Sequence, residues 1–385
     1  MTSLPLSSAR STRRFARGIT LVELMVVLAM MTFVLAASGY AYHSMRAVQK
    51  DAVLLSRVNG DARVALDLIA QEIRQAGFIG CNSELARESA MRSTETTVQK
   101  VSGLVNDFSI SAENVLRAFK ASDAASWGGA GEKPANAIGG DSHVIEVRYA
   151  GLEGATRLNG GPDFDRKVIK TRSRFEPSWG DDQASVVANR MGLISDCHGT
   201  MLFGVDSRTV DEVQMSPLAA ITASACGHSS RTEGDCMAWE VAAIYPIRVV
   251  QFYVANLGTV AAPDLYLVAR KRIMSATDPS DGAQRWNAPQ PVVAGVASLR
   301  VYGLGLDAAA PEELTYRVQR TRIETEAAPD VLTGMTAAEW ARVSRIDVRL
   351  RMQPDNGRPS GGGTSVLRNF ESSIAVRGRL AFDPR

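Results

Sequence analysis

The chain has 385 residues, of which 45% are hydrophobic and 22% are charged. This is an ordinary globular composition, and it excludes collagen-like, wholly disordered and polytopic membrane proteins. The formal net charge is only +2, so the overall charge gives no reason to expect nucleic-acid binding. The charge is unevenly placed, however, because residues 1–18 contain four arginines and no acidic residue. The N-terminus is thus a basic leader ahead of a slightly acidic remainder.

An uncharged segment follows the leader. From Leu24 to Met45 no side chain carries a formal charge. A helix of this length covers about 33 Å, which is enough to cross a hydrocarbon core of about 30 Å. The sequence therefore predicts one membrane-spanning helix over residues 21–45. Since the arginines precede it and the next basic residue is Arg46, the positive-inside rule places the N-terminus in the cytoplasm and the rest of the chain outside.

Three other interpretations of this segment are weaker. A cleavable signal peptide would use the small residues at 36–38, but its apolar region should be shorter and should not begin with a carboxylate. An unprocessed signal anchor leaves Glu23 and the sharp boundary between Gly18 and Ile19 unexplained. A buried core helix disagrees with the length of the segment.

Glu23 is the acidic residue of this segment. A carboxylate inside a membrane segment is costly and usually marks a specific partner. If the chain is cut after Gly18, the amine of Ile19 becomes a free cation. A neighbouring copy of the helix can then place that amine against the Glu23 carboxylate, and the two charges neutralise each other across a subunit contact.

The leader, Gly18, the apolar Ile19, the run Thr20-Leu21-Val22-Glu23-Leu24 and an uninterrupted apolar helix follow one another. This order resembles the class III signal of type IV pilins and type II secretion pseudopilins. The resemblance implies cleavage after Gly18 by prepilin peptidase, N-methylation of Ile19, and helix packing into a filament core with Glu23 setting the stagger. Ile19 departs slightly from the family, in which Phe is commonest at this position.

An amphipathic pattern continues the helix over residues 46–77. Apolar residues recur at steps of three and four, with charged residues between them. No proline interrupts the pattern and Gly60 is its one weak point, so the spanning part and this stem are expected to form one rod that stops at Gly77 and Gly80. A coiled coil or a juxtamembrane signalling helix is the alternative interpretation of the stem.

The stem ends in Ala65-Leu-Asp-Leu-Ile-Ala-Gln-Glu-Ile-Arg-Gln-Ala-Gly-Phe-Ile-Gly-Cys81. This run is similar to the PilW-like minor pilins. Patchy similarity continues at residues 141–150, 195–197, 265–270, 292–302 and 377–380. The resemblance implies a protein that sits with other minor pilins at the pilus tip, primes assembly of the major pilin by the inner-membrane machinery and supports a tip adhesin.

The rest of the chain predicts a β-rich head. Apolar and polar residues alternate over 144–149, 346–352 and 374–382, which is typical of antiparallel strands with one face on a core. Further strands are predicted at 240–255, 264–273, 298–304 and 313–323. A short helix is predicted at 336–343, because Thr336 and Glu339 have capping-box spacing. Loops rich in Gly, Pro, Ser or Asp are predicted at 121–141, 153–190, 224–237, 276–291 and 354–364.

The predicted fold class is therefore α+β, with a long N-terminal helix followed by a mainly antiparallel β-sheet head with long loops. The predicted divisions are a leader at 1–18, a pilin helix at 19–80 and a periplasmic head at 81–385. The helix divides further into a transmembrane part at 21–45 and an amphipathic stem at 46–77.

All four cysteines fall on the predicted exported side, where an even number favours two disulfides. Four cysteines allow three pairings. Cys226 with Cys236 is preferred, because the segment between them has no apolar anchor, and Cys81 with Cys197 follows. Zinc is the alternative, since His198 and His228 lie near two of the cysteines, but no metal-site spacing supports it.

No catalytic motif is recognised, and no enzyme activity, cofactor or metal is expected. The acidic runs at 163–165 and 278–281 lack the frame of a calcium loop and are interpreted as turns. Arginines of the last two predicted strands could contact DNA, but a solvated sheet face is preferred and no nucleic-acid partner is expected. These arginines are Arg345, Arg349, Arg351, Arg377 and Arg379.

Three functional classes stay open from the sequence. The favoured one is a minor pilin, held in the inner membrane before it enters the pilus. The second is a minor pseudopilin of a type II secretion system, which shares the N-terminal chemistry. The third is a signal-anchored exported sensor or enzyme, which would need a catalytic constellation that the sequence lacks.

Overall fold

The structure is a computed structural model. The residues that it describes are 20–78, 80, 99–100, 109–110, 114–127, 132–152, 155–163, 166, 168–172, 190–195, 200–208, 212–215, 240–259, 261–271, 286–307, 314–318, 331–332, 335–336, 339–340, 342–353 and 367–376. The chain divides into two compact units, Met1–Arg57 and Val58–Arg385, and each is described by itself.

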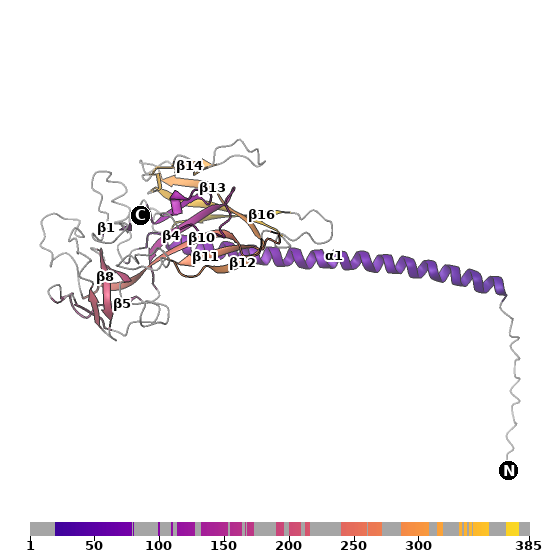
Figure 1. The fold of residues 1–385 in the computed structure, drawn as a ribbon, viewed down its shortest axis with the longest axis horizontal. Coiled ribbons are helices and arrows are strands. Elements are labelled where there is room, and N and C mark those ends of the chain that lie inside the picture. The colour runs from indigo at the N-terminus through magenta and orange to yellow at the C-terminus, as the bar shows by residue number, and fades with distance from the viewer. Residues whose placement is uncertain are drawn as a thin grey trace, which may run out of the picture. The chain divides into compact units, whose positions relative to one another are not determined.

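The helix α1 runs without interruption from Leu21 to Gln75 (Figure 1). No proline interrupts it, and Gly60 is accommodated within it, as the sequence predicts. The helix stops where expected, because Gly77 adopts a φ of 74°, a left-handed conformation that glycine takes without strain. The single predicted rod is confirmed.

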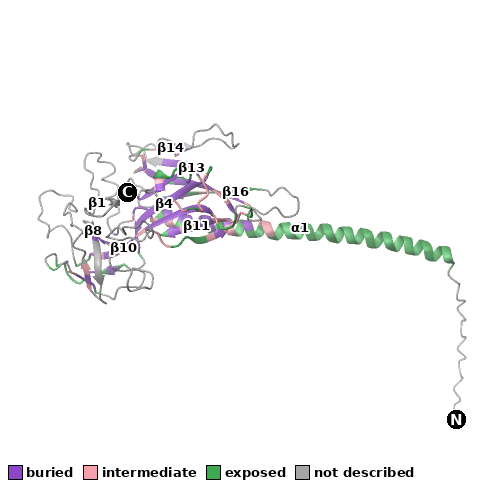
Figure 2. Cartoon of the chain, viewed as in Figure 1, coloured by how far each residue is buried: buried purple, intermediate pink, exposed green. Residues whose placement is uncertain are grey.

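In the first unit the helical side chains are exposed along its apolar part (Figure 2). The predicted stripe members Val48 and Ala52 are exposed as well, and burial of the stripe begins at Val58. The second unit therefore contains the last five turns or so of α1 together with the sheets.

The second unit is built from antiparallel strands. The strands are β1 (Gln99–Lys100), β2 (Ser109–Ile110), β3 (Leu116–Lys120), β4 (His143–Ala150), β5 (Thr156–Arg157), β6 (Val168–Lys170), β7 (Arg190–Ser195), β8 (Thr200–Arg208), β9 (Glu212–Met215), β10 (Ala243–Asn256), β11 (Leu265–Lys271), β12 (Gln290–Ala294), β13 (Val296–Asp307), β14 (Leu314–Val318), β15 (Val343–Met352) and β16 (Arg368–Ala375). A 3-10 turn, η1, covers Ala125–Trp127.

The strand β10 lies at the centre of the larger sheet, in which the described residues form ten strands. It pairs antiparallel with β11, β4, β5 and β7 along different parts of its length. The sheet continues through β8, β9 and β6 on one side and through β12 on the other, and β3 pairs with β4. The smaller sheet has four strands in the order β14, β13, β15, β16, and β1 and β2 form a separate pair.

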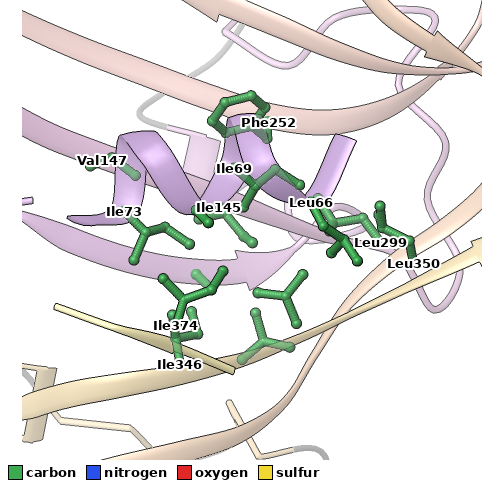
Figure 3. Close-up of a cluster of buried hydrophobic side chains, with 14 of the residues drawn as sticks. Leu66, Ile69, Ile73, Ile145, Val147, Phe252, Leu299, Ile346, Leu350 and Ile374 are labelled. Carbon is green, nitrogen blue, oxygen red and sulfur yellow. The ribbon is translucent and has the colours of Figure 1, made fainter. Parts of the chain in front are cut away.

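One hydrophobic core joins the stem to both sheets (Figure 3). The stem contributes Val58, Ala62, Ala65, Leu66, Ile69, Ala70, Ile73 and Ala76. The larger sheet contributes Ile145, Val147 and Phe252 among others, and the smaller sheet contributes Leu299, Ile346, Leu350 and Ile374 among others. Since full burial of each large apolar side chain contributes about 1.5–3 kcal/mol, this stripe anchors the stem in its unit.

The chain after α1 is also bonded to the larger sheet. The Gly77 amide donates to the Arg148 carbonyl over 3.0 Å, and the Ala150 amide donates to the Phe78 carbonyl over 2.6 Å. The Phe78 ring packs edge to face on Tyr245 of β10. Backbone and side chain together thus fix the exit from the helix.

The predicted strands agree with the structure at β4, β10, β11, β13, β14 and β15. The predicted capping box between Thr336 and Glu339 is present, but the turn after it is short because β15 already begins at Val343. The predicted loops at 224–237 and 354–364 lie outside the described residues.

Three predicted boundaries are wrong. The predicted loop at 153–190 contains the short strands β5 and β6, and the predicted loop at 276–291 overlaps the start of β12. The last described strand, β16, covers Arg368–Ala375, whereas the predicted strand covers 374–382. The part of the predicted strand beyond residue 376 lies outside the described residues. Residues 368–373 are mostly polar, so the alternation is weak in the sequence, although Ile374 lies in the core and Phe370 packs against it.

Candidate functional site

The helix α1 begins with reciprocal bonds between Thr20 and Glu23. The Glu23 amide donates to the Thr20 hydroxyl over 3.3 Å, while Glu23 Oε2 accepts from the Thr20 amide at 3.2 Å and from its hydroxyl at 3.3 Å. Thr20 directly precedes the first helical residue, so this is a capping box. It satisfies first-turn donors that have no partner inside a helix.

The capping box also places the Glu23 carboxylate at the positive end of the helix dipole. Both bonds from Thr20 use Oε2. Within the described residues Oε1 makes no hydrogen bond, and the side chain is exposed. One carboxylate oxygen thus serves the helix of its own chain.

The sequence prediction placed Gly18, Ile19 and Glu23 together as the processing and packing site. Gly18 and Ile19 lie outside the described residues, so the cut and the new amine stay predictions. The sequence predictions include Thr20 in the signal motif and give it no separate role. The threonine three residues before a glutamate was the signal for its capping role.

The helix behind Glu23 presents an apolar surface of unusual extent. The side chains of Phe33 and Tyr40 are 77% and 81% exposed, and the other large apolar residues from Leu21 to Met45 are exposed too. A patch of this size on a soluble protein marks a membrane or protein contact. The segment has the length and composition to span a membrane.

Polar groups in this apolar segment are placed at low cost. The Thr32 hydroxyl donates to the Ala29 carbonyl over 2.8 Å, so it is satisfied within the helix. At the other end, the Arg46 guanidinium lies 4.5 Å from the centre of the Tyr42 ring. An aromatic residue beside the first cation is typical of a membrane–water interface.

A second polar site is buried within the larger sheet, around Glu146 of β4. Glu146 is 2% exposed, and its carboxylate accepts two bonds from Arg117, at 3.0 and 3.1 Å, and two from Arg148, at 3.0 and 2.8 Å. Gln251 of β10 donates to Glu146 Oε2. The sequence predicted a single polar face for β4, but every residue of this strand is buried.

Arg270 extends this network toward the chain segments that cover the sheet. Its guanidinium donates to Gln251 Oε1 and to the Glu132 carbonyl, each over 2.9 Å. It also lies 4.1 Å from the ring centre of Trp286 and 5.1 Å from that of Trp127. Such cation–π contacts are stronger when water is excluded, as it is here.

Charge pairing controls the ionisation of the buried carboxylate. Burial by itself raises the pKa of Glu146. The positive charges of Arg148 and Arg117 lower this pKa by more than burial raises it, so that the pKa falls to about 2. The network is thus ionised and fully paired at neutral pH. Its charged groups are bonded to one another, and this pairing stabilises the ionised carboxylate in the folded head.

The four cysteines, with His198 and His228, lie outside the described residues. The nearest described residues are informative for one pair. Gly80, with a φ of 89°, lies so close to Ser195 that an added Cβ would be 2.6 Å from the Ser195 Cβ. Gly80 therefore lies directly beside Ser195 of β7. In the sequence, Gly80 is one residue before Cys81, and Ser195 is two residues before Cys197.

Other predicted sites take ordinary structural roles. Asp163 accepts from the Arg166 amide at 2.9 Å and pairs with Val168, so the first acidic run begins a turn as predicted. His143 is buried, and its Nδ1 atom accepts from the Val301 amide at 3.0 Å. Within the described residues no group of three or more His, Cys, Asp or Glu could hold a metal ion.

The arginines of β15 lie beside acidic groups of the same sheet. Arg345 bonds Asp347 over 3.1 Å, and Arg349 bonds Glu371 of β16 over 2.8 Å. Burial raises the pKa of Asp347, and the bond from Ser373 lowers it by less. Arg351 is part of the same strand, whereas Arg377 and Arg379 lie outside the described residues.

The comparisons with known proteins concern the N-terminus. The prokaryotic N-terminal methylation motif matches residues 13–39, which include the capping box and the first part of the apolar helix. No curated protein and no solved structure matches the chain. The motif is the class III prepilin signal, and together with the apolar helix it fits a membrane-anchored protein. These findings support a pilin-type or pseudopilin-type protein.

Proposed function

We propose that this protein is a PilW-like minor pilin that co-assembles at the tip of type IV pili and primes their assembly. The observation that carries the proposal is the position of Glu23. This residue forms a capping box with Thr20 inside the methylation motif, and an uncharged apolar helix follows it. A lone carboxylate at the entrance to a membrane segment needs a cationic partner. The amine of Ile19 on a neighbouring subunit is a partner of the right charge and depth.

The proposal includes a maturation order. Prepilin peptidase cuts after Gly18 and Ile19 is methylated, while the N-terminus is cytoplasmic and the head periplasmic. The helix then leaves the inner membrane for the filament, where its exposed apolar side chains meet other helices. The extent of that apolar surface supports this order, because it suits lipid before assembly and helix packing afterwards.

The proposed role is structural, without enzyme activity or cofactor. The proposed partners are the major pilin, the other minor pilins and a tip adhesin, with the prepilin peptidase and the inner-membrane assembly machinery acting on the chain. The proposal for a pilus is supported by a head of about 300 residues and by the stem ending around Gly77 to Cys81.

A minor pseudopilin of type II secretion is the second candidate, because the methylation motif serves both systems. Deletion of the gene separates them. Loss of surface pili with normal secreted enzymes supports the pilus, and the opposite result supports secretion. Complementation with the intact gene should restore whichever is lost, and a deletion strain normal in both would refute both assignments.

Mass spectrometry of the protein from membranes tests the maturation. The expected N-terminus is methylated Ile19. A chain that begins at Met1, or near Gly39, would contradict the pilin assignment and favour a signal-anchored or secreted protein.

A further inference from the structure

The strand β16 lies at one end of the smaller sheet, and its pairing with β15 shows which of its backbone groups point outward. The two strands pair over the whole of Arg368–Ala375 without a shift in register. Just beyond, the Val376 amide donates to the Ser344 carbonyl over 2.8 Å. Because bonded and non-bonded pairs alternate in an antiparallel ladder, the even-numbered residues of β16 direct their amides and carbonyls at β15. The odd-numbered residues direct theirs away from it.

The odd-numbered residues of β16 leave a row of backbone groups open. These residues are Asn369, Glu371, Ser373 and Ala375, and all of them are exposed. Within the described residues their amides and carbonyls make no hydrogen bond. The polar side chains are held on the face of the sheet, since Glu371 bonds Arg349 over 2.8 Å and Ser373 donates to Asp347. The edge is therefore not covered by its own side chains.

The strands at the other ends of the two sheets are less suited to pairing with a further strand. At one end of the larger sheet, β12 contains Pro291, which has no amide hydrogen, and its register with β11 shifts between Leu267 and Val268. At the remaining ends, β6 has three residues and β14 has five, whereas β16 has eight. Prolines, register shifts and short strands are the usual means by which proteins block an open edge. The strand β16 has none of these.

The two faces of β16 differ in polarity. On one face Ile374 lies in the core and Phe370, which is only partly buried, packs against it. On the other face the side chains of Glu371 and Ser373 bond polar groups of β15. A strand added beside β16 would place alternate side chains next to Phe370 and the others next to Glu371. The edge therefore fits an extended segment in which apolar and polar residues alternate.

The direction of the stem argues against a second copy of this chain as the added strand. The core residues of the stem extend from Val58 to Ala76, about 27 Å of helix, so the stem lies along the sheets (Figure 3). Antiparallel pairing of two β16 edges relates the two copies by a twofold axis perpendicular to the sheet. That axis reverses the direction of the stem, whereas two stems that enter the same membrane from the same side run in the same direction. The added strand therefore belongs to a different protein.

We propose that the open edge of β16 is a docking site for an extended segment of another protein, which adds a strand to the smaller sheet. The segment bonds the backbone of the outward-pointing residues from Asn369 to Ala375 and therefore spans about seven residues. Its backbone supplies the affinity, and its alternate side chains supply the specificity. The inference rests on the edge of β16 and does not depend on the proposed role in pili.

Amide hydrogen exchange in the full chain, held in detergent micelles and followed by NMR, tests the site. In the chain alone the amides of Ser372 and Ile374 should exchange slowly, and those of Glu371 and Ser373 should exchange rapidly. A peptide of alternating valine and threonine is the probe, and it should slow exchange at Glu371 and Ser373 by about tenfold at saturation. The same peptide with N-methyl groups on alternate residues should have no effect. Protection of Glu371 and Ser373 without peptide would overturn the proposal, because their own chain, or a second copy if protection rises with protein concentration, would then cover the edge.

Two neighbouring serines provide matched variants. Ser373→Pro and Ser373→Ala both lose the hydroxyl, but only the proline variant loses the outward amide hydrogen, so it should bind the peptide about tenfold more weakly than the alanine variant. Ser372→Pro loses an amide hydrogen that bonds β15, so it should destabilise the head in urea by more than Ser373→Pro does. Should Ser373→Pro not fold, Asn369→Pro and Asn369→Ala form a second such pair. No slowing of exchange by the peptide at millimolar concentration, or equal binding by the proline and alanine variants, would disprove the docking site.

Discussion

The Glu23 carboxylate accepts bonds from both the amide and the hydroxyl of Thr20, and it uses the same oxygen for each. Glu23 therefore has a role within its own chain, as part of a helix cap, in addition to the proposed role between chains. A substitution of Glu23 by alanine removes both roles at once. The two must be separated before a loss of assembly can be assigned to the missing charge.

Glu23→Gln separates the two roles, because glutamine also serves in a capping box but carries no charge. Both Glu23→Gln and Glu23→Ala should leave membrane insertion, cleavage after Gly18 and head stability nearly unchanged. Both should weaken recovery of partner pilins by roughly a hundredfold or more, since a buried amine is left unpaired. The measurement is pull-down from membranes together with a count of surface pili.

The outcome for Glu23→Gln decides the assignment. Normal partners and normal piliation in that variant, with no other copy or paralogue expressed, would show that the charge is dispensable. If Glu23→Ala alone is defective, the helix cap is what assembly requires. Thr20→Val, which removes the hydroxyl of the cap and keeps the carboxylate, should then reproduce the alanine defect.

Gly80 and Gly160 provide a matched test of the contact beside β7. Both adopt a φ of 89°, but an added Cβ meets Ser195 at Gly80 and nothing within 4 Å at Gly160. Gly160→Ala should cost only the strain of its backbone, about 1–2 kcal/mol. Gly80→Ala should cost clearly more, as seen in urea unfolding. Equal costs would mean that the chain around Gly80 moves freely away from Ser195.

The cysteine pairing stays a prediction, because all four cysteines lie outside the described residues. Peptide mapping without reduction should find Cys81 joined to Cys197 and Cys226 joined to Cys236. Among the described residues, Gly80 lies beside Ser195, and Cys81 and Cys197 follow these two residues by one and two positions in the sequence. Crossed pairs would refute the assignment, and four free thiols would favour metal binding or a reducing compartment.

Glu146 should make the head sensitive to strong acid. Its pKa is lowered from 4.5 to about 2, so its ionised form stabilises the fold above the ordinary glutamate pKa. That contribution, about 3 kcal/mol, is lost as the pH falls from about 4.5 toward 2. The acid-induced decrease in unfolding free energy should be smaller in Glu146→Gln than in the natural chain.

The same variant should be less stable at neutral pH, since Arg117 and Arg148 would lose the charge that balances them in a buried site. A control is Glu212→Gln, which removes the exposed partner of Lys170 and should change stability by less than about 1 kcal/mol. Equal effects of the two substitutions would show that the buried network does not stabilise the head as its geometry implies.

The features of the N-terminal helix follow from the sequence alone. The leader, Glu23 and the uncharged run are neighbours along the chain, and a helix of fixed rise converts their spacing directly into position. The stripe of the stem is local in the same sense, because steps of three and four define a helix face whatever packs on it. The place where the helix stops was also predictable, from the conformational freedom of Gly77 and Gly80.

The tertiary structure decided what lies opposite each strand. Glu146 and Arg148 alternate with apolar residues as solvent-facing side chains would, yet both are buried, and Arg117 of β3 and Gln251 of β10 bond the Glu146 carboxylate. Likewise, nothing local marks His143 as a partner of Val301, which is 158 residues away. Such contacts depend on which strands meet in space, and alternation along one strand records that a face exists without recording what covers it.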